Sequence, residues 1–350
     1  MGRPDGSVVE SMSLAPVANR LEQLLEEKVL FLNDCLGQNV ESACQKSAER
    51  IIMLENLRFH IEEEGKCKCK DGTVLVAESN RVAEFGQFLS KLADVYVNDA
   101  FGCVHRAHSS ITGISIEPRV AGLLVQKELK FFSMILEDSK QLELLILGGA
   151  KLSDKIQLIE QMLPKTKRIM IGGGMAFTFL SKISGIRIGK SLYDAEGAAI
   201  IPAIMEKAKA LNVDIILPHD FVVSSEFSED GGHQKLVLAE SGIDDNDFGL
   251  DIGPESSKYF GEIISNIKGD DKVILWNGPM GVFYWKKYSN GTRCVLEALA
   301  ATTETNHTVT VVGGGDSSAA VAKWHFENRL SHVSTGGGAS LELLEGIFIR

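Results

Sequence analysis

The stretch that decides the fold is residues 144–163, which read LLILGGAKLSDKIQLIEQML. Its first four residues, Leu144–Leu147, form an apolar run that ends in a pair of glycines. Apolar residues then recur at helical spacing at Ile156, Ile159 and Leu163. An apolar strand, a glycine turn and an amphipathic helix in this order form the repeating unit of a parallel α/β sheet. Because the strand has no polar face, we expect helices to cover the sheet on both sides.

The same alternation continues along the chain. Further strands are predicted where short aliphatic runs end in glycine or a polar turn, at Ile51–Leu54, Asp94–Val97, Arg168–Ile171, Val213–Leu217, Lys272–Trp276 and Thr308–Val312. Helical spacing recurs at Val82, Phe85, Leu89 and Leu92. The periodic segment 118–137 is longer than an ordinary crossover helix, so we expect it to connect two sheets. The charged segment 62–72 is predicted to be a solvated loop.

Length and composition indicate a globular protein of two domains. The chain has 350 residues, and a typical domain has roughly 150. Hydrophobic residues make up 44 % and charged residues 24 % of the chain, close to the averages for soluble proteins. The net charge of −11 argues against nucleic acid or an anionic membrane as a partner. Glycine is in excess, with 34 residues, and the positions of these glycines bear on function.

Targeting signals and cysteine patterns favour a cytosolic protein. No apolar run approaches the roughly 20 residues that a membrane helix needs, and the first residues lack the apolar core of a secretory signal. The six cysteines contain no CxxC pair. Cys67 and Cys69 form a CxC without histidines or a second pair at zinc spacing. They are predicted to be solvated loop thiols in a reducing compartment rather than metal ligands.

Five glycine-rich turns each follow an apolar run. They begin at Gly148, Gly172, Asn277, Gly313 and Gly336. In a parallel sheet such turns lie at the carboxyl ends of the strands, where ligands bind, and their N–H groups suit phosphate. A single turn of this kind can equally be a tight strand-to-helix connection. Their number in the second half favours a phosphate-rich ligand there.

The common nucleotide-binding fingerprints are absent. There is no GxGxxG motif, which argues against a dinucleotide dehydrogenase. Residues 185–191, GIRIGKS, have three residues between the glycines where a Walker loop has four. We therefore do not expect a phosphate cradle at this segment, and no protein-kinase motif is present either.

Three charged residues accompany the glycine turns. Lys151 and Lys155 lie four residues apart, so both can share one face of a helix start. Two cations there oppose the helix dipole unless an anion is bound, although a solvated lysine pair is the alternative. Asp316 follows three glycines at a predicted helix start. It can cap the helix, hold the Mg²⁺ of a nucleotide, or do both.

The first half carries arginines that suit an anionic substrate. Arg3 lies in a Gly-Arg-Pro turn, and Arg58 and Arg106 each follow a predicted strand. Guanidinium groups bind carboxylates and phosphates in a bidentate manner. One such arginine is usually a surface ion pair, whereas three at comparable positions indicate an anion pocket.

Several longer strings are specific enough to show a resemblance. They closely resemble phosphoglycerate kinase, in order and over essentially the whole chain: ENLRFH, DVYVNDAFG, HRAHSS, LGGAKLSDKI, IGGGMAFTFL, GLDIGPES, WNGPMGVF, VVGGGDSS and SHVSTGGGASLELLEG. The resemblance implies two Rossmann-like parallel-sheet domains joined by a long helix and a hinge that closes them. It also implies reversible phosphoryl transfer in glycolysis from 1,3-bisphosphoglycerate to Mg-ADP, giving 3-phosphoglycerate and ATP.

The resemblance also implies roles for individual residues. Arg3, Arg58 and Arg106 match the arginines that hold phosphoglycerate, and Lys151 matches the lysine that follows the transferring phosphoryl group. Asp316 matches the Mg²⁺ ligand. Backbone N–H groups of Gly336, Gly337 and Gly338 are implied to point toward the transferring group. The implied nucleotide pocket consists of Gly148, Gly149, Lys155, Gly172, Gly173, Gly249, Leu250, Asn277, Pro279, Tyr284, Gly314, Gly315, Asp316 and Ser317.

The expected organisation follows from the same resemblance. Residues 1–120 are expected to form the phosphoglycerate-binding domain, 121–138 an interdomain helix, and 139–335 the nucleotide-binding domain. Residues 336–350 are expected to return toward the hinge. The expected partners are ADP or ATP with Mg²⁺, and 3-phosphoglycerate or 1,3-bisphosphoglycerate. We expect a cytosolic monomer that binds neither nucleic acid nor membrane.

Three departures from the family pattern leave a second function class open. The family has RVDFNVP, and later SHL, before the GRP with which this sequence starts, so the first domain is expected to lack its first strand and helix. Tyr284 stands where the family motif GVFE has a glutamate on the ribose, so weaker ribose binding is expected. The sequence ends at Arg350, before the family's final segment. The alternatives are an active kinase and a truncated nucleotide-binding remnant with little or no transferase activity.

Overall fold

The computed structural model describes residues 2–69, 71–137 and 140–347. The chain divides into two units, Met1–Val125 and Gln126–Ile349, each of which is described separately. None of the helices in these described ranges is both long and apolar enough to cross a bilayer.

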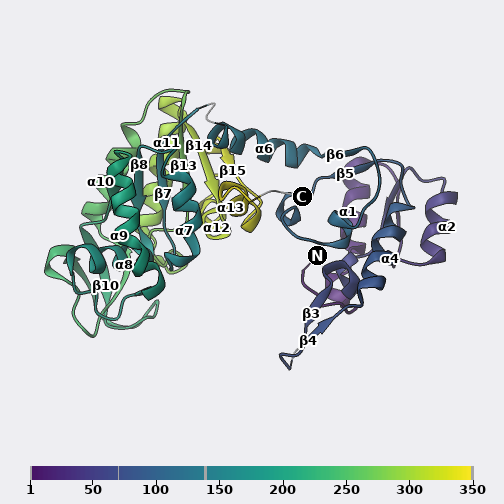
Figure 1. Ribbon diagram of the computed structural model, residues 1–350, viewed down its shortest axis with the longest axis horizontal. Coiled ribbons are helices and arrows are strands. Elements are labelled where there is room, and N and C mark those ends of the chain that lie inside the picture. The colour runs from purple at the N-terminus through teal and green to yellow at the C-terminus, as the bar shows by residue number, and fades with distance from the viewer. Residues whose placement is uncertain (1, 70, 138–139, 348–350) are drawn as a thin grey trace. The chain divides into compact units, whose positions relative to one another are not determined.

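The second unit is built on a parallel sheet of six strands in the order β15-β14-β13-β7-β8-β9 (Figure 1). The strands are β7 Gln141–Leu147, β8 Arg168–Ile171, β9 Asp214–Ile216, β13 Lys272–Asn277, β14 Val309–Gly313 and β15 His332–Val333. All neighbouring pairs are parallel. Leu144, Ile274 and Trp276 are fully buried. The predicted α/β class is confirmed, and the continuous apolar runs are explained by burial on both faces.

Helices lie on both faces of this sheet (Figure 1). They are α7 Ile156–Met162, α8 Gly173–Ser184, α9 Ala195–Ala210, α10 Pro254–Ser265, α11 Asn290–Asn306, α12 Gly315–Trp324 and α13 Gly338–Leu344, with single 3₁₀ turns η4 Ser153–Lys155, η5 Ala239–Ser241, η6 Lys286–Tyr288 and η7 Glu327–Arg329. Phe260 of α10 and Leu299 of α11 are fully buried in the same apolar cluster as Trp276. Helices α10 and α11 therefore share one continuous core with the sheet.

A second, antiparallel sheet was not predicted from the sequence. It contains β10 Asp220–Ser224, β11 Gln234–Leu238 and β12 Phe248–Ile252, in the order β11-β10-β12. The central strand β10 is buried along its whole length, whereas the edge strand β11 is largely exposed. This sheet carries Gly249 and Leu250, two residues of the implied nucleotide pocket.

The described residues of the first unit contain three two-stranded sheets. The parallel pairs join β1 Val29–Phe31 to β2 Ile51–Met53 and β5 Tyr96–Asn98 to β6 Arg119–Ala121. The third pair is the antiparallel hairpin of β3 Lys66–Lys68 and β4 Val74–Val76. The helical elements are η1 Glu10–Met12, α1 Ala15–Leu25, α2 Gln38–Lys46, η2 Leu57–Phe59, α3 Ile61–Glu64, α4 Ser79–Ser90, η3 Phe101–Cys103 and α5 Ser109–Thr112.

Two predictions about this unit are wrong. Segment 62–72 is a solvated turn only at Asp71 and Gly72, because its earlier residues contribute to α3 and β3, and Glu62 and Glu63 are buried; Lys70 lies outside the described residues. The connecting helix α6 is Leu123–Leu136 rather than the full segment 118–137, since the residues before it pair as strand β6. Burial of the two glutamates is possible because each finds hydrogen-bonding or ionic partners.

Candidate functional site

The five glycine turns lie at one edge of the second unit's sheet. They follow β7, β8, β13, β14 and β15, which are mutually parallel neighbours, so their carboxyl ends point the same way. The backbones of neighbouring turns are in direct contact. A side chain on Gly148 would place its Cβ only 2.1 Å from the carbonyl oxygen of Pro279. Glycine is therefore required at position 148, because only a residue without a side chain lets the turns after β7 and β13 pack this closely.

A cavity of about 540 Å³ opens beside these turns. Of the residues implied by the resemblance, its walls contain Gly149, Gly173, Gly249, Leu250, Pro279, Tyr284 and Asp316. An aromatic and apolar wall faces them, contributed by Phe177, Phe221, Phe227, Phe248 and Phe283. Close-packed glycine turns and the start of helix α12 on one side, with apolar rings on the other, suit a ligand that has both phosphates and a flat apolar part.

Lys155 lies at the carboxyl end of strand β13. Its ammonium group donates a hydrogen bond to Oδ1 of Asn277, the last residue of β13. Burial lowers the pKa of Lys155, although the carboxylates of Glu345, Asp154 and Asp316 act in the opposite direction. The side-chain amide nitrogen of Asn277 is buried without a hydrogen-bond partner. A partly desolvated cation beside an unsatisfied donor is an arrangement that an anion would complete.

The two lysines do not share a helix face, contrary to the prediction. Lys151 precedes the 3₁₀ turn η4 and is exposed, whereas Lys155 ends that turn and is half-buried. The difference arises because α7 starts only at Ile156. Burial alone would raise the pKa of Asp194, but backbone hydrogen bonds from Ser153 and Gly197 outweigh it and lower the pKa, and the charge of Lys151 adds to this in a minor way.

Asp316 lies in the first turn of α12 and is exposed at the cavity. The hydroxyl of Tyr284 donates a hydrogen bond of 3.0 Å to its Oδ1. Burial, and next the neighbouring carboxylate, raise the pKa of Tyr284. Ser317, the next residue, is buried and accepts a 2.6 Å hydrogen bond from the N–H of Gly278. A single exposed carboxylate beside phosphate-binding turns fits Mg²⁺, which is commonly bound by one or two carboxylates and by substrate phosphates.

The turn at Gly336–Gly338 is fixed by a buried carboxylate. Glu128 of α6 accepts 2.8 Å hydrogen bonds from the N–H and hydroxyl of Thr335 and a 2.6 Å bond from Nε2 of His332. Burial alone would raise the pKa of Glu128, but these hydrogen bonds outweigh it and hold the pKa below its usual range. The glycines that follow Thr335 are thereby held next to β15.

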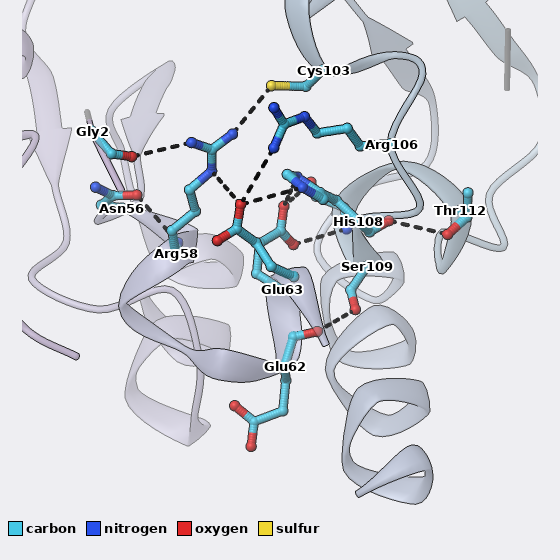
Figure 2. A network of polar contacts seen from close by, with 12 residues as sticks. Gly2, Asn56, Arg58, Glu62, Glu63, Cys103, Arg106, His108, Ser109 and Thr112 are labelled. Atoms are coloured by element: carbon cyan, nitrogen blue, oxygen red, sulfur yellow. Dashed lines mark hydrogen bonds and ion pairs between the residues drawn. The ribbon is translucent and has the colours of Figure 1, made fainter. Parts of the chain in front are cut away.

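In the first unit, Glu64 connects two of the three predicted arginines. Its Oε1 lies 3.5 Å from Nε of Arg58, 4.0 Å from Nη1 of Arg106 and 3.4 Å from Nε2 of His108. Figure 2 shows the side chains of Arg58, Arg106 and His108 converging on this point. One carboxylate thus partly neutralises a cluster that would otherwise repel itself and attract anions.

A cavity of about 610 Å³ lies beside Arg58. The guanidinium of Arg58 donates to the carbonyl oxygen of Gly2 at 3.1 Å and to Sγ of Cys103 at 3.3 Å (Figure 2). Arg3 follows Gly2 directly and is exposed. Within the described residues, the cavity wall includes Arg58, Cys103 and His108 but neither Arg3 nor Arg106. The structure therefore brings Arg58 and Arg106 together around Glu64 and leaves Arg3 at the adjacent surface.

Comparison with known proteins identifies the family. The sequence profile described as phosphoglycerate kinase matches residues 1–347. The chain belongs to the phosphoglycerate kinase family. It is 49 % identical over 347 residues to the "Probable phosphoglycerate kinase" of Caenorhabditis elegans, covering 99 % of this chain and 82 % of that protein. It is 49 % identical over 348 residues to the "Phosphoglycerate kinase 1" of Homo sapiens, with the same coverage.

Solved structures agree with this assignment. Phosphoglycerate kinase from Coxiella burnetii matches with a TM-score of 0.78 and 33 % identity, covering 99 % of this chain and 82 % of that one. The enzyme from Pyrococcus horikoshii matches with a TM-score of 0.74 and 26 % identity, covering 96 % and 80 %. The predicted function of a glycolytic phosphoglycerate kinase is confirmed, and the alternative of a truncated nucleotide-binding remnant is not favoured.

Several residues at the two sites of this phosphoglycerate kinase had no signal in the sequence. The aromatic wall comes from segments that lie far apart in the chain, such as Phe177 and Phe248. Glu64 lies in a run of acidic residues that is typical of a solvated surface. The rejected Walker-like segment 185–191 follows helix α8 rather than a strand, so it lacks the context of a phosphate loop. Its Lys190 and Ser191 nevertheless line the cavity.

Proposed function

We propose that this chain transfers the phosphoryl group of an acyl phosphate, 1,3-bisphosphoglycerate, reversibly to Mg-ADP, with the carboxyl group of 3-phosphoglycerate as acceptor in the reverse direction. The single observation that carries this proposal is that half-buried Lys155 bonds to Asn277, which begins one glycine turn, while this turn and its neighbours contribute Gly149, Gly173 and Pro279 to the wall of an apolar cavity. Phosphoryl transfer needs positioning and neutralisation of charge more than covalent chemistry from the protein.

The second unit binds the nucleotide in this proposal. The base and sugar occupy the 540 Å³ cavity between the aromatic wall and Tyr284. The phosphates lie at the turns that contain Gly149, Gly173 and Gly314–Ser317, where glycine lets a ligand approach the backbone and the N-terminus of α12 favours negative charge. Gly148, Gly172, Asn277 and Pro279 support this arrangement by bringing the turns together.

Lysines neutralise the phosphates. Lys155 is proposed to contact the nucleotide phosphates, because its ammonium group is already partly desolvated and held by Asn277. Lys151 is proposed to follow the transferring group, since it is exposed at the edge of the sheet. The N–H groups of Gly336, Gly337 and Gly338 are proposed as further donors to that group.

Asp316 is the residue that would hold Mg²⁺. When bound, the ion supplies a divalent positive charge that neutralises the nucleotide phosphates. Tyr284 donates its hydroxyl proton to the same carboxylate, so it orients Oδ1 and leaves Oδ2 without a tyrosine contact. The oxygen donors at this position match the preference of Mg²⁺ for carboxylate and phosphate ligands.

The first unit binds the phosphoglycerate in this proposal. Arg58 and Arg106 supply guanidinium groups around Glu64, and Arg3 adds a third from the neighbouring surface. We further propose that the domains extend over 1–120 and 139–335, with 121–138 as connector and 336–350 as a terminal segment. The boundary between the two units falls within helix α6, which supports a connecting role for it. A cytosolic monomer remains our expectation.

A coupled assay of ATP formation from 1,3-bisphosphoglycerate and ADP tests the proposal. Wild type is expected to turn over, and Lys151→Met is expected to lower kcat by at least about a hundredfold, because it removes a cation that acts in the transition state. The matched control is Lys182→Met, an exposed lysine at the end of α8. No activity in wild type, or equal losses in both variants, would contradict the assignment.

A further inference from the structure

The 540 Å³ cavity of the second unit contains a lysine to which the proposed function gives no role. Lys190 lines this cavity together with Phe227 and Phe248. Its ammonium group lies 5.7 Å from the centroid of the Phe248 ring, which is within the distance of a cation–π contact. Among the lining residues that the structure describes, Lys190 is the only lysine or arginine. The wall that the aromatic rings form therefore carries one positive charge.

The backbone on either side of Lys190 is fixed in place. Gly189 has a φ of +55°, and a Cβ there would lie 2.5 Å from the carbonyl oxygen of Asp247, so this position needs glycine. The N–H of Lys190 donates to the same carbonyl oxygen at 2.8 Å. Oγ of Ser191 accepts a 2.8 Å hydrogen bond from the N–H of Gly249. These contacts hold the turn against strand β12, so the lysine side chain starts from a defined point on the cavity wall.

Neighbouring carboxylates do not neutralise Lys190. Asp247, whose carbonyl oxygen holds the turn, has its carboxylate 2.7 Å from the ammonium group of Lys235. Asp251 and Asp316 also line the cavity, but Asp251 accepts backbone N–H groups and Asp316 accepts a tyrosine hydroxyl. Within the described ranges, no carboxylate lies at ion-pair distance from Lys190. Its N–H donors are therefore available to a ligand in the cavity.

An ammonium group on the aromatic wall distinguishes between purine bases. It has three N–H donors and no acceptor. Guanine and hypoxanthine present two neighbouring acceptors, O6 and N7, whereas adenine presents the acceptor N7 beside an amino donor at C6. A lysine can thus donate to both atoms of a 6-oxopurine, but to only one of the corresponding pair in adenine. The position and chemistry of Lys190 favour the 6-oxopurine.

We propose that Lys190 makes the nucleotide site of this chain accept 6-oxopurine nucleoside diphosphates, GDP and IDP, by donating hydrogen bonds to O6 and N7 of the base. This inference rests on the proposed function, in which the base lies against the aromatic wall and the phosphates lie at the glycine turns. The contact with Phe248 already places the ammonium group on that wall. Lys190 is thus a specificity-determining residue that acts on the choice of nucleotide and not on the transfer step.

Calorimetric titration of the full chain with ADP, GDP and IDP, each with saturating Mg²⁺, tests the proposal. GDP and IDP should bind at least as tightly as ADP. Lys190→Met should weaken the binding of GDP and IDP by at least about fivefold, the lower end of the range for a good pair of base contacts, and change that of ADP by less than about twofold. Lys190→Gln should reverse the order in favour of ADP, because an amide donates to N7 of adenine and accepts from its amino group.

A control variant and the third nucleotide separate the possible outcomes. Lys182→Met removes an exposed lysine at the end of α8 and should leave all three affinities unchanged. Equal losses of ADP and GDP binding in Lys190→Met would place its ammonium group at the phosphates, and no loss of either would leave it only a cover for Phe248. Both results overturn the proposal, as does weaker GDP binding with unchanged IDP binding, which would assign the recognition to the 2-amino group.

The same titrations distinguish this inference from the proposed function on which it rests. A wild-type chain that binds ADP but neither GDP nor IDP refutes the role of Lys190 and leaves the nucleotide site of the second unit intact. A chain that binds none of the three nucleotides overturns both.

Discussion

Replacing Glu64 by glutamine should tighten the binding of phosphoglycerate. The carboxylate of Glu64 lies 3.5 Å from Arg58 and 4.0 Å from Arg106, the two arginines proposed to hold the substrate. An incoming phosphate or carboxylate therefore shares these cations with a resident negative charge. Glu64→Gln keeps an acceptor oxygen for the guanidinium groups and removes only the charge. The two guanidinium groups then bind the substrate anion without competition from the negative charge of Glu64.

The size of the effect follows from Coulomb's law. A substrate anion on the far side of a guanidinium lies about 6 Å from the Glu64 carboxylate. The side chains of Arg58 and Glu64 are 21 % and 20 % exposed, so screening by water is substantial. With an effective dielectric constant of about 40, the repulsion removed is about 1.4 kcal/mol. This corresponds to about a tenfold lower Kd for 3-phosphoglycerate.

Calorimetric titration with 3-phosphoglycerate at low and high ionic strength measures this effect, which salt should diminish. Glu62→Gln is the matched control: Glu62 also lies on α3, but its carboxylate pairs with Arg81 at 2.8 Å and points away from the arginine pair (Figure 2). The unliganded Glu64→Gln protein should be less stable, because Arg58, Arg106 and His108 lose their common partner. Unchanged or weaker binding in Glu64→Gln, or equal tightening in Glu62→Gln, would refute this reasoning.

Three further predictions concern the second unit. Tyr284→Phe frees Oδ1 of Asp316 and should strengthen the Mg²⁺ dependence of ADP binding by roughly 2–10-fold; a weaker dependence in a Mg²⁺ titration would contradict this. Lys155→Met should weaken ADP binding by at least about tenfold while costing little stability, because it removes a partly desolvated charge; calorimetry and thermal melts measure both, and a large drop in Tm with unchanged affinity would count against it. The folded-state pKa of Glu128 is depressed, so its contribution to stability is present above the unfolded pKa of about 4.3 and is lost as the pH falls through the lower folded value. Denaturant unfolding of Glu128→Gln should lack this acid-dependent loss, and an unchanged pH profile would show that the carboxylate contributes nothing.

Much of the second unit could be predicted because its sequence repeats one physical pattern. Continuous apolar runs such as Leu144–Leu147 fit only strands that are buried on both faces, and such strands are parallel. Once the strands are parallel, the turns that follow them must lie at one edge. The clustering of Gly149, Gly173 and Asp316 around one cavity then follows from order along the chain alone.

The aromatic wall of the cavity could not be predicted in the same way. Phe227 lies in a loop and is largely exposed, yet its ring contacts Phe248 and Trp285 at centroid distances of 6.1 and 4.9 Å. These residues come from three segments whose meeting depends on the antiparallel sheet. That sheet has no continuous apolar pattern, because β11 is an exposed edge strand. Local periodicity therefore contains no information about this wall.

The acidic run at Glu62–Glu64 shows a second limit of sequence patterns. Hydrophilic residues in succession indicate solvent, but the structure buries Glu62 and Glu63. Each has a partner distant in sequence: Arg81 pairs with Glu62, and Ser110 donates to Glu63 at 2.6 Å. A sequence displays the charge of a residue but not the group that compensates it, and this compensation decides whether the charge can be buried.

The two proposed anion sites solve the same electrostatic problem by different means. In the first unit, the guanidinium groups of Arg58 and Arg106 are paired with a resident carboxylate, Glu64, which an incoming anion must outcompete. In the second unit, backbone N–H groups cost no side-chain entropy, and Lys155 is partly desolvated before any ligand arrives. A small carboxylate-phosphate ligand presents few contacts, so an exchangeable counter-ion keeps its site from binding any anion tightly. A nucleotide brings apolar surface as well as charge, so its site can combine glycine turns with the aromatic wall.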